Sequence, residues 1–232
     1  VTLRPYTNGV AIDLGAATNP LGGPLSLADA ELDRITAGTL QIGDANSGAI
    51  TVSTAISRSA NTAMNLTSGG AVNLNASSLN LNGGNLSINA GGGVNPTAAG
   101  ADVAVGTASF TAGNDLNIVI NGTTADTDYS QLNVAGSVNL TGLDLVLSGS
   151  YTPVGGNTFI IVNNDGSDAI TGTFTGLAQG ATISNFLGSG LNATISYTGG
   201  DGNDVVISVA VVNPDYTITT AGNTLIITDV SG

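Results

Sequence analysis

Residues 64–88 read MNLTSGGAVNLNASSLNLNGGNLSI, and this stretch decides the fold. In residues 64–66, 72–74, 79–81 and 86–88, one polar residue separates two apolar residues. Such a triplet places its apolar side chains on one face of a strand and its polar side chain on the other. The Gly, Asn, Ser and Ala clusters between the triplets are typical of turns. The stretch therefore predicts very short strands, each with one buried face.

The spacing of the triplets predicts how these strands are arranged. Met64 and Leu86 lie 22 positions apart, as do Ile50 and Val72, with about three triplets in each interval. A meander of hairpins would favour longer strands and two-residue Asn-Gly or Asp-Gly turns. Three short strands in a period of roughly 20 residues instead indicate one coil of a parallel β-solenoid. We therefore predict an all-β fold in which equivalent triplets stack on one another.

Stacking would join the apolar residues of successive coils into a continuous internal column. The exposed Asn residues would stack as amide ladders on the outer wall. The predicted column residues include Leu40, Ile50, Leu66, Val72, Leu74, Leu79, Leu81, Leu86 and Ile88.

Residues 27–36 have a helical pattern, with Ala28, Leu32 and Ile35 at helical spacing. Ser26 is the predicted N-cap, and Gly38 is the predicted stop. We interpret this helix of two to three turns as an excursion that covers an end of the solenoid. A helix that docks a partner is the alternative.

The pattern changes after Asn95-Pro96, where longer strands and most of the aromatic residues occur. We predict a short-coil solenoid over residues 1–96, and a wider continuation or a β cap over residues 97–212. Residues 213–232 are predicted to open a following β module, and both ends of the chain are expected to be cut from a longer protein.

The composition and the charge exclude several classes of function. The 232 residues include no Cys, His, Trp or Lys. Three arginines, Arg4, Arg34 and Arg58, oppose 16 acidic residues for a net charge of −13. The chain therefore lacks an imidazole base, a thiol nucleophile, a Schiff-base lysine and a Cys/His metal cluster. A nucleic acid backbone would be repelled. No apolar run approaches the roughly 18–20 residues of a membrane span.

Several longer stretches resemble known bacterial surface proteins. VTLRPYTNGVAIDLGA (1–16) and LSLADAELDRITAGTLQIGDANSGAITVS (25–53) resemble modules of filamentous-haemagglutinin-like proteins. LNVAGSVNLTGLDLVLSGSYTPVGGNTFIIVNNDGSDAITGTFTGL (132–177) and ISYTGGDGNDVVISV (195–209) are similar to the passenger ends of autotransporter-type β-strand repeat proteins. The resemblance implies a right-handed parallel β-helix within a large secreted or surface-anchored protein. Such proteins commonly serve as adhesins, stalks or surface fibres.

Two acidic loops are the candidate metal sites. GGDGNDVVI at 199–207 matches the calcium-binding nonapeptide GGxGxDxUx, with Asp201, Asn203 and Asp204 as candidate ligands. Calcium in such repeats lies between successive copies, and here there is one copy, so we favour a Gly-Asp turn that enters a strand. Asp165 and Asp168, in residues 163–168, are further candidates, for which an Asx-rich turn is favoured. We predict no cofactor, with calcium as the alternative.

Paired carboxylates are the catalytic device that this composition allows. On a strand, Asp126 and Asp128 would share a face at ~7 Å, a separation suited to an inverting glycosidase. Their neighbours indicate a loop instead, and no cation or Trp lies nearby to bind a sugar. We therefore predict that the protein is not an enzyme. A carbohydrate-active β-helix enzyme is a remote alternative.

Together these patterns predict a non-enzymatic structural or adhesive module that acts as a stiff rod or stalk. A self-assembling extracellular filament subunit is the alternative. The expected partners are neighbouring modules of the same polypeptide, further copies in a fibre, and host or environmental surface glycans. Nucleic acid and a membrane span are not expected. The expected location is extracellular or on the bacterial cell surface.

Overall fold

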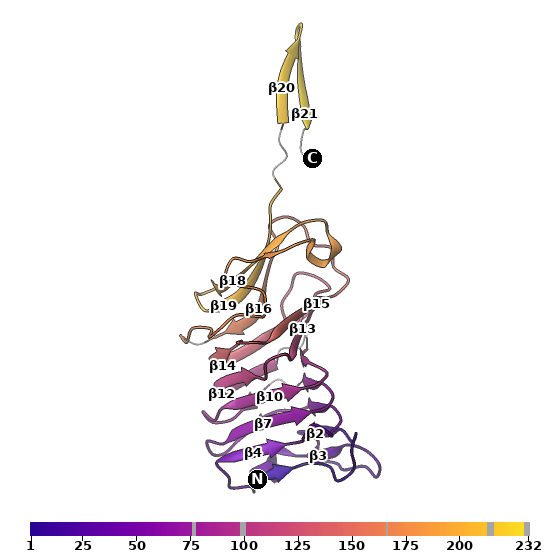
Figure 1. Cartoon of the computed structure of the whole chain (residues 1–232), viewed down its shortest axis with the longest axis vertical. Helices are drawn as coiled ribbons and strands as arrows, with labels where there is room; N and C mark the ends of the chain where they lie inside the picture. The colour runs from indigo at the N-terminus through magenta and orange to yellow at the C-terminus, as the bar shows by residue number, and fades with distance from the viewer. Residues whose placement is uncertain (76–77, 98–100, 166, 213–215, 230–232) are drawn as a thin grey trace.

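The computed structural model describes residues 1–75, 78–97, 101–165, 167–212 and 216–229. It is mostly β, with strands stacked along the long axis of an elongated molecule (Figure 1). Within these residues, one short α-helix lies near the N-terminus. The prediction of a mostly β protein with one short N-terminal helix is confirmed.

The larger sheet extends from the N-terminal end through most of the stacked body. In its strands over residues 39–42 and 63–68, buried and less buried residues alternate as the triplets predicted. In order, they are β1 (Thr2–Leu3), β4 (Thr39–Ile42), β7 (Ala63–Ser68), β10 (Leu86–Ala90), β12 (Ala101–Phe110), β14 (Leu132–Asn139) and β16 (Thr158–Asn164). Two short strands join it at the side, where β6 (Ile56–Ser57) pairs with β9 (Leu79–Asn80), and β9 pairs with β12.

The second sheet is also parallel. In order, its strands are β15 (Asp144–Ser148), β13 (Asp115–Val119), β11 (Val94–Pro96), β8 (Val72–Leu74), β5 (Ile50–Val52), β2 (Ile12–Leu14) and β3 (Leu25–Leu27). The chain alternates between the two sheets, so each sheet gains one strand at nearly every pass.

The 22-residue spacing is the pairing register of the central strands of both sheets, from β5 to β13 in one and from β7 to β12 in the other. Ile50 is the partner of Val72, and Val72 is the partner of Val94. In the larger sheet, Met64 is the partner of Leu86. The predicted equivalence of triplets 22 residues apart is therefore confirmed for these strands.

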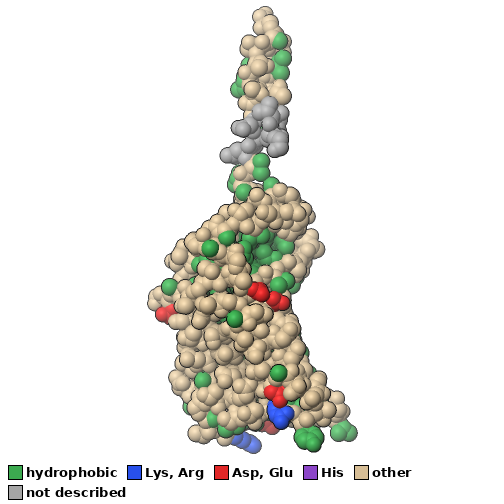
Figure 2. Space-filling model, viewed as in Figure 1, with side chains coloured by type: hydrophobic (Ala, Val, Ile, Leu, Met, Phe, Trp, Pro, Cys, Tyr) green, Lys and Arg blue, Asp and Glu red, His purple; other side chains and the backbone are tan. Residues whose placement is uncertain are grey.

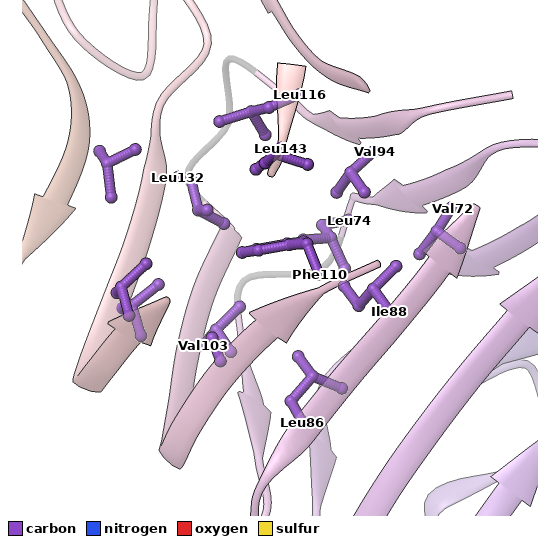
Figure 3. Close-up of a cluster of buried hydrophobic side chains, with 14 of the residues drawn as sticks. Val72, Leu74, Leu86, Ile88, Val94, Val103, Phe110, Leu116, Leu132 and Leu143 are labelled. Carbon is purple, nitrogen blue, oxygen red and sulfur yellow. The ribbon is translucent and has the colours of Figure 1, made fainter. Parts of the chain in front are cut away.

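The core lies between the sheets. Every predicted column residue is buried, and none is more than 2% exposed. Figure 3 shows part of this cluster, with Val72, Leu74, Leu86, Ile88 and Leu116 converging from strands of both sheets. Small branched side chains suit such closely spaced strands, because they pack well against neighbours on a pleated surface.

An amide ladder follows the outer surface of the second sheet. The Asn73 side-chain amide donates to Thr51 Oγ1 at 3.3 Å, and the Asn95 amide donates to Asn73 Oδ1 at 2.8 Å. Asn117 continues the series by donating to Asn95 Oδ1 at 2.7 Å. The ladder predicted from the exposed Asn positions is confirmed across β5, β8, β11 and β13.

The helix α1 (Asp29–Leu32) is shorter than the predicted 27–36, and its predicted boundaries are wrong. Ser26 is not the N-cap, because it is a buried residue of β3 whose N–H donates to Asn19 Oδ1. The N-cap is Ala28, whose N–H donates to the Glu31 carboxylate. Gly38 is not the stop, since the helix ends after Leu32.

The pairing direction changes in the C-terminal half. β16 pairs in parallel with β14, but antiparallel with β19 (Asp204–Val209). β19 then pairs antiparallel with β18 (Ala193–Gly199), and β18 with β17 (Thr182–Ile183). A 3₁₀ turn, η1 (Phe186–Gly188), places Phe186 in the core.

Aromatic rings fill the core where the parallel stack ends. The ring of Phe159 lies 5.4 Å from that of Tyr129 and 5.7 Å from that of Phe186, measured between centroids. Phe174 and Tyr197 form a further pair at 6.1 Å. Large rings bury more area than the aliphatic residues of the column. They therefore fill the core at the point where the antiparallel strands begin.

A two-stranded hairpin stands apart from the body, formed by β20 (Tyr216–Ala221) and β21 (Thr224–Asp229) (Figure 1). Its described side chains are exposed, including Ile218 and Ile227, which are partners across the hairpin. The predicted module boundary at Asn213-Pro214 lies outside the described residues, as do residues 230–232.

Candidate functional site

The antiparallel pairing of β16 and β19 brings the two predicted acidic loops together. β16 ends at Asn164 and β19 begins at Asp204, so loop 163–168 leaves the sheet where loop 199–204 enters it. Gly166, in the first loop, lies outside the described residues. The sequence indicates two separate candidate loops, and the structure brings them together.

Hydrogen bonds join the two loops. The backbone N–H of Asn164 donates to Asp204 Oδ1 at 2.9 Å. The side-chain amides of Asn164 and Asn203 both donate to the main-chain oxygen of Asp168, the second at 3.1 Å. These oxygens therefore accept hydrogen bonds from within the protein, as expected for Asx-rich turns.

Asp204 is the most buried of the candidate ligands, with 3% of its surface exposed. Burial raises the pKa of its carboxyl, because a charged group loses hydration there. The N–H of Asn164 opposes this rise in pKa, whereas the negative charge of Asp201 adds to it. Burial therefore destabilises the charged form of Asp204, and the hydrogen bond from Asn164 offsets part of this effect.

A surface pocket of about 380 Å³ lies beside this network, lined by Ser167, Ala169, Asp201, Gly202 and Asn203. Within the described residues, no three acidic side chains lie close enough together to hold a metal ion. Calcium needs six to eight oxygen ligands. Calcium binding at these loops therefore stays the alternative to the favoured Gly-Asp turn.

Asp165 does not line this pocket. It lines a smaller pocket of about 40 Å³ that also includes Asp102 and Asn133. The structure thus brings Asp168, Asn203 and Asp204 into one network and places Asp165 beside a different part of the sheet.

The Asp126 and Asp128 carboxylates lie in a loop, as their neighbours in the sequence indicated. Asp126 has a φ of 59°, in the left-handed region, and its Oδ2 accepts from the Asn133 amide at 3.4 Å. Asp128 Oδ2 accepts from the N–H of Thr124 at 3.1 Å. Asp128 lines a groove of about 390 Å³ next to β11 and β13, and Asp126 is not among its lining residues. The two carboxylates therefore differ in surroundings and do not share one strand face.

The amide ladder is the most regular polar surface of the protein. Its donors and acceptors are half-buried and point along the stack, each Asn binding its neighbour 22 residues away. Glycan binding at this wall remains a prediction.

Within the described residues, no helix is both long enough and apolar enough to cross a membrane. Comparisons with protein-family models, with curated proteins and with solved structures gave no match to this chain.

Proposed function

We propose that this chain is a right-handed parallel β-helix that serves as a stiff rod or stalk in a large secreted or surface-anchored bacterial protein. The observation that supports this proposal best is the constant 22-residue register, repeated through β5, β8 and β11. Each pass adds a strand, a buried apolar pair and one rung of the ladder. Length is thereby gained by adding repeats, as a spacer requires.

The physical case for stiffness comes from the two features that run along the axis. The apolar column gives stacked strands such as β5, β7, β8 and β10 a buried face, and the ladder links the outer faces of the second sheet through side-chain hydrogen bonds. Bending the stack would open gaps in the column and stretch the ladder on one side. The acidic residues and neutral amides of the wall would keep such a rod soluble.

The resemblance to filamentous-haemagglutinin-like and autotransporter-type proteins supports an extracellular or cell-surface location. It also supports an adhesive role for the wall, with surface glycans as the ligands. A self-assembling filament subunit is the second candidate. It is favoured by β1 and β3, which are the outermost strands at one end of their sheets.

The rod can be tested by adding repeats. Three tandem copies of residues 64–85, inserted after residue 85, should lengthen the folded molecule by about 14 Å, at ~4.7 Å per added strand layer. Small-angle scattering measures the maximum dimension, and circular dichroism reports folding. A scrambled insert of equal composition is the matched control. If both inserts behave alike, the stacking of repeats does not underlie the fold, and the rod is refuted.

The adhesive role needs its own measurement. A glycan array probed with the full chain should show weak hits that diminish when Asn73 and Asn95 are both replaced by Ala. An array without hits would leave the chain as a spacer. Electron microscopy of the wild-type protein separates single rods from filaments.

A further inference from the structure

The short strand β6 has one edge that pairs with β9. On this side the N–H of Ile56 donates to the Ser78 oxygen at 3.1 Å, and that of Arg58 donates to the Asn80 oxygen at 2.8 Å. Because successive N–H groups of a strand point to opposite edges, those of Ser57 and Ser59 point the other way. Further copies or other strands could pair with such an edge if it were open.

Two carboxylates occupy this second edge, one from Asp29, the first residue of α1, and one from Asp33, its C-cap. Asp29 Oδ1 accepts from the N–H of Ser57 at 2.8 Å, and Asp33 Oδ1 accepts from the N–H of Ser59 at 3.1 Å. Residues four apart on a helix rise by about 6 Å, and residues two apart on a strand by about 6.6 Å. An acidic pair at this helical spacing therefore matches alternate N–H groups of a strand.

Arg58 fastens this arrangement from the strand side. Its guanidinium donates to Asp33 Oδ1 at 3.0 Å and to the Ile35 oxygen at 3.0 Å. The Arg58 side chain is 2% exposed, and a buried cation needs such a partner. Leu32, fully buried, anchors the helix in the core beneath.

We propose that α1 is an edge clamp: it holds the β6 edge closed against a second copy of this chain. The occupant would be a second N-terminal end, because β1 and β3 are also outermost strands there. Two such ends would meet through the same surface on each copy, which gives a closed dimer. This inference does not depend on the proposed role as a rod.

The test removes the two carboxylate acceptors at Asp29 and Asp33 and compares the result with a variant of the same charge that keeps an oxygen acceptor at each position. The Asp29→Ala/Asp33→Ala variant lacks both carboxylates, whereas Asp29→Asn/Asp33→Asn keeps an oxygen acceptor at each position. Both variants lose the same ion pair with Arg58, so their difference isolates the coverage of the edge. In sedimentation velocity over a hundredfold concentration range, the Ala variant should shift towards twice the mass of the wild-type protein. The Asn variant should stay at the wild-type mass.

Several outcomes would overturn the proposal. These are an Ala variant with the wild-type mass at every concentration, equal association of the two variants, or growth of the Ala variant beyond a dimer. Hydrogen exchange on the wild-type protein supplies a measurement that does not require the variants to fold. The Ser57 and Ser59 amides should exchange at least about tenfold more slowly than in an unstructured peptide, because each must first break its hydrogen bond to a carboxylate. Exchange at the unstructured rate would refute the clamp.

Discussion

Replacing Asn95 by Ala tests whether the amide ladder stabilises the stack. The Asn95 side chain donates to Asn73 at 2.8 Å and accepts from Asn117 at 2.7 Å, so the substitution removes two hydrogen bonds. A net 0.5–1.5 kcal/mol for each bond gives about 1–3 kcal/mol. Because the site is half-buried and water can replace part of this, we expect a loss of about 1–2 kcal/mol in the free energy of unfolding.

Asn65 provides the matched control. It occupies the same outward position in the Met64-Asn65-Leu66 triplet of β7 and is also half-buried. Within the described residues, its side chain makes no hydrogen bond. Asn65→Ala therefore changes strand propensity and side-chain size in the same way without breaking a ladder. We expect its effect to stay within about 0.5 kcal/mol.

Urea unfolding followed by far-ultraviolet circular dichroism suits this comparison, because the chain has no Trp. The melting temperature of Asn95→Ala should fall by about 2–8 °C for a chain of this size. Equal destabilisation by the two substitutions would refute the reasoning, since the ladder would then contribute nothing beyond the residue change. A double-mutant cycle between Asn73 and Asn95 would measure their coupling directly.

Three further predictions concern the turns and the acidic loops. Gly84→Ala should destabilise the protein by about 1–3 kcal/mol in urea unfolding, because the added Cβ would collide with the Thr62 carbonyl oxygen. Gly38→Ala is the control, since its Cβ would face open space, and it should be nearly neutral. Equal effects of the two substitutions would contradict the close approach at Gly84. Folding raises the pKa of Asp204 above its unfolded value of 3.8, so protonated Asp204 favours the folded state. That contribution to stability is fully present below pH 3.8 and is lost as the pH rises through the pKa of the folded state. Asp204→Asn should therefore gain stability relative to wild type between pH 3 and pH 7, and a flat difference across that range would show that burial of the charge has no cost. Millimolar calcium should leave the melting temperature unchanged, and a rise that Asp204→Asn abolishes would establish the calcium site instead.

The strands and their register could be predicted because the signal is local and repeated. Each triplet predicts which side chains are buried. The 22-residue spacing predicts which triplets pair as neighbouring strands, as Ile50 and Val72 do. The same logic predicted the ladder, since stacked equivalent positions bring like side chains together.

The boundaries of α1 were not predictable in this way. The helix pattern of residues 27–36 is compatible with a longer helix, but contacts distant in the sequence decide where it begins and ends. Asp33 binds Ser59 and Arg58, and Ser26 is drawn into β3. The signal available in the sequence was Arg58 itself, an isolated cation that needed an acidic partner.

The meeting of the two acidic loops was hidden for a different reason. Alternation of apolar and polar residues does not report whether two strands run parallel or antiparallel. The antiparallel pairing of β16 with β19 joins Asn164 to Asp204 across 40 residues, and the alternation pattern does not predict it. That pairing is sufficient to bring loop 163–168 and loop 199–204 to the same end of the β16–β19 pair.

The ladder also bears on how the protein responds to its surroundings. Residues 61–101 contain no ionisable side chain, so β8 and β11 are held by backbone hydrogen bonds, neutral amides and aliphatic packing. Acid, alkali and salt act chiefly on charged groups. The middle of the stack should therefore be indifferent to changes in pH and ionic strength that disturb both ends. A structure built in this way would keep the spacing of these coils in fresh water, brine or an acidic niche, while the coils that carry charged residues respond to the change.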